Sequence, residues 1–181
     1  MLGLLRVFAV LLIIYPLATK SFAANTQNMH LLGQGKAYYL NFIKVYDASL
    51  YSSEIMARDK ILSSDVSKCL HLEYAVDVGR KDFITAANKV LQRQFGPERL
   101  QGIESELNTL HEGYRDVQEG DSYTLCYRDA DQTTTLSLNG NEIVAISSAD
   151  FAEVYFSIWL GSNKPLDTNL RNSLLAAAID S

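Results

Sequence analysis

The stretch CLHLEYAVDV, residues 69–78, decides which kind of fold this chain adopts. Its even-numbered positions are all apolar and its odd-numbered positions are mostly polar or small, the period of a β-strand with one buried face. Residues 122–128 repeat this alternation. Residues 36–52 are rich in Tyr, Val, Ile and Phe, which predicts one long strand or two strands with a bend near Asn41. We therefore expect a sheet with one apolar face that other elements must cover.

Segments with helical periodicity are predicted to cover this face. Apolar side chains recur every three or four residues in 80–95 and again in 100–117, where they form one continuous stripe. Residues 151–159 predict a third helix, and a last helix begins near Asp167. The order of strands, two helices, strands and two helices predicts an α+β domain, an antiparallel sheet with helices over one face.

The connecting segments give weaker signals. Asn139-Gly140 predicts a tight hairpin between strands at 133–138 and 142–147, because both positions of that turn need a positive φ. Residues 24–33 look like an irregular leader, and residues 54–64 like a short helix or a loop.

Composition excludes several classes of protein. The 181 residues are 48% apolar and 20% charged, which fits one globular domain and excludes a disordered or low-complexity chain. The formal net charge is −5, and no cluster of lysine and arginine is present to neutralise phosphates. We expect no nucleic-acid partner.

Residues 1–23 have the pattern of a secretory signal peptide. A positive charge near the start precedes an apolar stretch over residues 7–18, and small residues stand before a cut after Ala23. The apolar part is short for a membrane span, and an uncleaved anchor is the alternative. Cleavage removes two positive charges and no acid, which takes the net charge from −5 to −7. We expect residues 24–181 to form a single exported domain, periplasmic or secreted, without a transmembrane span.

Export changes the interpretation of the two cysteines, Cys69 and Cys126. A disulfide is plausible in an oxidising compartment, and both cysteines fall on the polar faces of their predicted strands. Their sulfurs would lie on the same side if those strands are neighbours in one sheet. Two free thiols on unconnected strands is the alternative.

Motifs that carry chemistry are few. Gly33-Gln34-Gly35 lacks the preceding strand and the third glycine of a phosphate-binding loop. The three histidines are isolated, and Asp129 and Asp131 lack the remaining ligands of a calcium loop. We assign no catalytic residue, no metal and no cofactor. Several tyrosines lie on predicted strands, where they suit either the core or a cavity that needs an apolar wall with a few hydroxyls.

Two segments carry a family resemblance: NFIKVYDASLY at 41–51, and FAEVYFSIWLG at 151–161, followed by Pro-Leu-Asp at 165–167. They resemble the bacterial chalcone isomerase-like proteins, which are related to plant chalcone isomerase and to plant fatty-acid-binding proteins. The resemblance covers about residues 32–179. It implies an open-faced antiparallel β-sandwich with a helical layer and a ligand cleft between sheet and helices.

The resemblance does not extend to the catalytic residues of the plant enzyme. Its arginine position falls at residues 34–36, its threonine near Tyr46, its tyrosine near Phe83, its asparagine near Val90 and its late hydroxyl residue at Ile158. A register slip would bring in four near neighbours, namely Lys36, Thr85, Asn88 and Ser157. None of the five positions matches outright, and each lost donor removes roughly 3 kcal/mol of stabilisation of developing negative charge. We expect no chalcone isomerase activity.

The fatty-acid-binding relatives suggest a different use of the cleft. They hold a carboxylate with an arginine and a tyrosine, and here Lys36 is the nearest cation, with Tyr38 or Tyr46 as the hydroxyl. We take these three and Phe83 as candidate ligand-binding residues. The alternative is a solvated lysine and core tyrosines.

Three functions remain open from the sequence. The first is an exported, non-catalytic domain that binds an apolar small molecule or fatty acid. The second is an enzyme of unknown isomerase- or lyase-type reaction in the same cleft, which predicts a buried group with a perturbed pKa there. The third is a structural or partner-binding envelope protein, which predicts a filled core and an exposed apolar patch.

Overall fold

A computed structural model describes residues 26–40 and 42–180 of the chain. Six strands form one antiparallel sheet whose spatial order follows the sequence. They are β1 (His30–Tyr39), β2 (Ile43–Ser52), β3 (Lys68–Tyr74), β4 (Ser122–Arg128), β5 (Thr133–Leu138) and β6 (Asn141–Ser147). The signal peptide expected at 1–23 and the bend expected at residue 41 lie outside the described residues.

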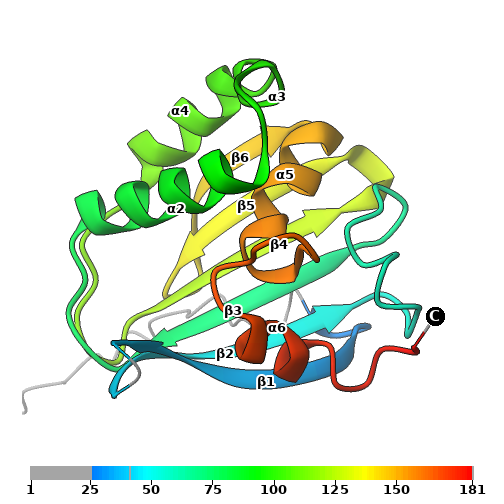
Figure 1. The fold of residues 1–181 in the computed structure, drawn as a ribbon, viewed down its shortest axis with the longest axis horizontal. Coiled ribbons are helices and arrows are strands. Elements are labelled where there is room, and N and C mark those ends of the chain that lie inside the picture. The colour runs from blue at the N-terminus through cyan, green and yellow to red at the C-terminus, as the bar shows by residue number, and fades with distance from the viewer. Residues whose placement is uncertain (1–25, 41, 181) are drawn as a thin grey trace, which may run out of the picture.

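The helices lie over one face of this sheet (Figure 1). They are α2 (Arg80–Gln94), α3 (Pro97–Gln101), α4 (Glu104–Gly113), α5 (Ala149–Leu160) and α6 (Thr168–Leu174), with a 3-10 turn η1 (Asp129–Asp131) between β4 and β5. Helix α6 packs against β1, α4 against β6, and α5 against β5 and α2. The α+β architecture predicted from the order of elements, an open-faced sheet with a helical layer, is confirmed.

The core lies between the two layers. The even-numbered side chains of β3 that were expected to face inward, Leu70, Leu72 and Tyr74, are buried. Helix α5 contributes the largest share from the helical side, with every residue from Val154 to Leu160 buried. Ser148 caps this helix by accepting a hydrogen bond from the Phe151 backbone N–H.

Two local predictions are wrong, and a third region takes one of its two expected forms. The leader expected at 24–33 already contains the start of β1, at His30. Residues 54–64, expected as a short helix or a loop, form a loop of turns and bends. The strand expected over 69–78 ends at Tyr74, after which the chain leaves the sheet, and Val78 forms an isolated antiparallel bridge with Val117.

The continuous helix expected over 100–117 is also wrong. It is divided into α3 and α4 at Gly102 and Ile103, and α4 ends before Tyr114. The side chains of the stripe are nevertheless buried, because Tyr114 and Val117 point into the core from an extended segment. Periodicity identified the inward-facing positions but not the backbone conformation between them.

The Gly33-Gln34-Gly35 sequence has a packing role. A Cβ on Gly33 would lie 2.1 Å from the backbone oxygen of Ser173 in α6, and a Cβ on Gly35 would lie 2.7 Å from the Leu170 side chain. These two glycines therefore allow helix α6 to approach β1 closely.

Cys69 and Cys126 form a disulfide. The two residues are direct partners in the β3–β4 register, so the sulfurs lie on the same side of the sheet. The bridge predicted from strand alternation is confirmed. It closes a loop with a sequence separation of 57.

Candidate functional site

A cavity of about 690 Å³ lies between the sheet and the helices. This size is within the usual range for small-molecule sites. Side chains of β1 to β5 form one wall, and side chains of α2 and α5 with Tyr114 form the other. The buried lining residues are Ala37, Tyr46, Leu72, Tyr74, Ala87, Tyr114, Tyr123, Leu125, Leu136, Tyr155 and Trp159.

The cavity opens between the β1–β2 hairpin and helix α2, because the exposed members of its lining come from there. These are Tyr38, Tyr39, Ile43, Asp77, Asp82, Thr85, Ala86 and Lys89. The hairpin tip beside the mouth is apolar and exposed: Leu40 is 62% and Phe42 72% accessible. The mouth therefore has an apolar lip on one side and a helix with charged residues on the other.

Aromatic rings form much of the cavity wall. The Tyr74 ring meets the edges of Tyr46 and Phe83, with centroids 5.6 and 5.5 Å away. Phe83 also stacks on Tyr114 at 5.2 Å. Such edge and stacked contacts fix ring positions, so the wall presents a defined surface.

The tyrosine hydroxyls in the wall differ in their hydrogen-bond partners. Tyr114 and Tyr155 bond to each other across 2.6 Å. The hydroxyl of Tyr123 donates to the backbone oxygen of Arg115 and accepts from its N–H. The Tyr123 hydroxyl thus both donates and accepts, whereas in the Tyr114–Tyr155 pair one hydroxyl donates and the accepting hydroxyl keeps its own hydrogen.

Tyr46 and Tyr74 retain hydrogen-bonding capacity. The Tyr46 hydroxyl accepts the indole N–H of Trp159 at 3.0 Å, which leaves its own hydrogen to donate. Among the described residues, no hydrogen-bond partner is found for the Tyr74 hydroxyl, although the residue is only 4% exposed. Because Tyr46 and Tyr74 are direct partners in the β2–β3 register, both project from the same face.

Burial keeps these phenols neutral. Loss of solvation raises the pKa of Tyr46 and Tyr114 and raises that of Tyr74 and Tyr155 well above the usual value. At neutral pH all four are hydrogen-bonding groups and not general acids or bases. The enzyme hypothesis predicted a perturbed group in the cleft, and the perturbation found moves the pKa away from the range useful for proton transfer.

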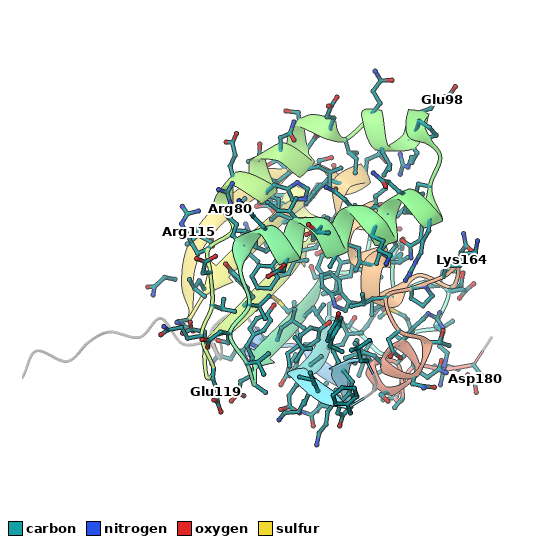
Figure 2. The ribbon with its side chains drawn as sticks, turned by 60° about the vertical axis from the view of Figure 1, so that its left-hand side comes forward. Arg80, Glu98, Arg115, Glu119, Lys164 and Asp180 are labelled. Atoms are coloured by element: carbon teal, nitrogen blue, oxygen red, sulfur yellow. A yellow bond between two sulfur atoms is a disulfide. The ribbon has the colours of Figure 1, made fainter. Side chains whose placement is uncertain are left out.

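Charged groups of the lining stand at the mouth. They are three carboxylates, Asp77, Asp82 and Asp167, and one ammonium, Lys89. Asp167 accepts the Leu170 N–H as the cap of α6. Six other charged side chains, Arg80, Glu98, Arg115, Glu119, Lys164 and Asp180, lie at the periphery of the molecule (Figure 2).

Three of the four candidate ligand-binding residues line the cavity, and one does not. Tyr46 and Phe83 lie in the cavity wall, and Tyr38 lies at its mouth. Lys36 is exposed and is not in this lining; it lines a smaller depression beside α6 together with Tyr38.

The positions aligned with the plant enzyme's catalytic residues fall partly outside the cavity. Val90 and Ile158 are buried in the core and do not line it. Of the near neighbours, Thr85 lines the mouth, whereas the Ser157 hydroxyl donates to Gln94 at 2.8 Å.

Sequence reasoning missed Tyr74 and Trp159. Tyr74 was placed on the inward face of its strand, so its burial was predictable, but its unpaired hydroxyl was not. The bond from Trp159 to Tyr46 joins residues 113 positions apart, and no local pattern indicates it.

In the part of the chain that the structure describes, no group of three or more His, Cys, Asp and Glu side chains is arranged to hold a metal ion. None of the described helices has the length and apolar character needed to span a membrane.

Comparison with known proteins gives a family and a fold. The chalcone isomerase-like family profile matches residues 17–176. No curated protein matches. Among solved structures, a fatty-acid binding protein of Arabidopsis thaliana is similar, with a TM-score of 0.61 and 17% identity over 82% of this chain and 87% of that chain. At this identity the likeness is one of fold.

Proposed function

The chain belongs to the chalcone isomerase-like family, and on that premise we propose that it is an exported, non-catalytic domain that binds an apolar small molecule between sheet and helices. A fatty acid is the first candidate, because the similar plant protein is a fatty-acid binding protein. The cavity of about 690 Å³ is the observation that carries this proposal. Its wall is aromatic and aliphatic with a few hydroxyls, the usual character of a site for an apolar ligand.

The chemistry of the wall supports a non-catalytic role. The positions that correspond to the plant enzyme's arginine and threonine carry other side chains, and the buried tyrosines stay protonated at neutral pH. The wall offers neutral hydrogen-bond donors, and no cation lies among its buried residues to stabilise developing negative charge.

Export is supported by two independent features. Residues 1–23 have the pattern of a cleavable signal peptide. The disulfide between Cys69 and Cys126 is compatible with an oxidising compartment outside the cytoplasm. We propose a periplasmic or secreted location for residues 24–181.

One observation favours the alternative of a partner-binding envelope protein. The tip of the β1–β2 hairpin exposes several apolar side chains, including Tyr39, Leu40 and Phe42. The filled core that this alternative predicted is not found, since the cavity is present.

The test of ligand binding uses the full-length gene product purified in its native form. Organic extraction followed by mass spectrometry should recover a lipid in near-stoichiometric amount, or the stripped protein should bind an uncharged fluorescent acyl probe. Absence of both results would contradict the proposal.

A cavity-filling variant locates the site. Ala87→Phe places a large ring into the cavity from α2 and should weaken probe binding by roughly tenfold or more, because the ring occupies ligand space. Ala145→Phe adds the same ring at an exposed position of β6 and is the matched control. Equal probe affinity in both variants would place the ligand elsewhere.

A further inference from the structure

The interior of the cavity offers hydrogen bonds without charge. The charged lining residues Asp77, Asp82, Lys89 and Asp167 are confined to its mouth, and the buried lining is apolar apart from tyrosine hydroxyls and one indole N–H. Lys68, a lysine buried in the described part of the chain, does not contribute to this lining.

Two hydroxyls are available to a ligand inside. Tyr46 has accepted the indole N–H and keeps its hydrogen free, and Tyr74 has no protein partner among the described residues. Among the described residues, the fully enclosed side-chain nitrogen and oxygen atoms that lack a hydrogen bond lie on His111, Thr134 and Arg58, and the Arg58 Nε is ion-paired with Asp180. The Tyr74 hydroxyl is not among them, so it keeps access to the cavity that its side chain lines.

This arrangement disfavours an anionic end group. A carboxylate taken into an apolar cavity without a cation is costly. At the mouth it would meet three carboxylates against a single ammonium. Neither the interior nor the mouth of the cavity therefore stabilises an anionic end group.

The arrangement favours an oxygen that accepts two hydrogen bonds. A neutral carbonyl oxygen has two lone pairs and no hydrogen to place, and Tyr46 and Tyr74 can each donate one hydrogen. We infer that the cavity binds an uncharged apolar molecule through a carbonyl oxygen held between Tyr46 and Tyr74, in preference to a free fatty-acid carboxylate. This inference rests on the proposed binding of an apolar molecule and replaces the free fatty acid with an uncharged carbonyl compound as the first candidate ligand.

The test compares four ligands of matched chain length: dodecane, dodecanoate, methyl dodecanoate and the corresponding methyl ketone. Their affinities are measured by displacement of an uncharged fluorescent probe near neutral pH, with every ligand kept below its solubility limit. The ester and the ketone should bind roughly tenfold or more tightly than the carboxylate. Dodecane reports the contribution of the chain alone.

A variant pair assigns the preference to the proposed oxygen site. Tyr74→Phe should weaken the ester and the ketone by about three- to tenfold, the value of one hydrogen bond, and leave dodecane unchanged. Tyr127→Phe removes a hydroxyl that bonds Ser64 outside this lining, and it should leave all four affinities unchanged.

The outcomes separate this inference from the proposed function. If dodecanoate binds as tightly as the ester or more tightly, or if Tyr74→Phe weakens every ligand equally, the carbonyl site is refuted while the ligand-binding function stands. If the probe binds but none of the four ligands displaces it, the carbonyl site is refuted; if neither the probe nor any of the four ligands binds, the binding function itself fails.

Discussion

Lys68 provides a quantitative test of the packing beneath α5. Its ammonium lies inside the protein, where it donates to the backbone oxygens of Ser63 at 2.9 Å and Val66 at 3.0 Å. It also stands over the ring of Tyr127, 4.7 Å from the centroid. Burial outweighs the nearby acids Asp129 and Glu153 and lowers the pKa of Lys68 from 10.5 to about 8.

The sign of the resulting pH dependence follows from proton binding. Above pH 8 the folded protein releases the Lys68 proton, whereas the unfolded chain keeps it until about pH 10.5, so the unfolded state binds more protons. The free energy of unfolding should therefore rise with pH through this range. The free energy of unfolding should increase by about 1.4 kcal/mol between pH 7 and pH 9, the value of one pH unit above the folded pKa.

The assay is urea unfolding followed by circular dichroism at closely spaced pH values from 7 to 9, for the wild type and for Lys68→Met. The variant should lack the rise of about 1.4 kcal/mol. The difference between the two proteins cancels the titration of the tyrosines, which is common to both. Lys60→Met, at an exposed position, controls for loss of a positive charge. Parallel curves for wild type and Lys68→Met would refute the burial of a charged lysine.

Two further predictions concern covalent and steric features. Alkylation should label Cys69 and Cys126 only after reduction, and labelling without reductant would contradict the disulfide. Replacing both cysteines with serine should lower the free energy of unfolding by about 4 kcal/mol, as expected for a disulfide that closes a loop with a sequence separation of 57. Gly33→Ala should lower the free energy of unfolding by about 2 kcal/mol, because the new Cβ would lie 2.1 Å from the Ser173 backbone oxygen. Gly96→Ala is the control: its Cβ meets nothing within 4 Å, so stability should change little in the same denaturant assay.

The sequence predicted the layers of the fold because the layers depend on local periodicity. Alternation in 69–78 and helical spacing in 80–95 each indicate which side chains are buried. This information does not depend on which other element of the fold covers them. The same reasoning failed for 100–117. A buried stripe can continue from a helix into an extended segment when both pack on the same core, and Tyr114 is buried in such a segment.

The site was predicted less completely, because it depends on contacts between distant residues. The resemblance selected Tyr46 and Phe83, which lie in the cavity wall, and also Lys36, which lines a separate depression. Lys36 was chosen as the nearest cation in sequence. Which residues of β1 reach the cavity depends on the strand's register, and β1 has an irregularity between Ala37 and Tyr38 that a sequence does not reveal.

The tyrosines indicate which kind of ligand end group the cavity accepts. A phenolate in the cavity wall carries negative charge near the place where a ligand carboxylate or a developing oxyanion would carry it. For Tyr46 and Tyr74 burial raises the pKa, so the cavity resists negative charge on its own wall. An environment that resists a phenolate also resists a bound carboxylate, because neither charge has a cation among the buried lining residues. A neutral carbonyl avoids this penalty and still uses the hydrogens that the protonated phenols retain. Spectroscopic titration should accordingly find these two tyrosines protonated well above pH 10, and a normal titration of both would remove this argument for a neutral ligand.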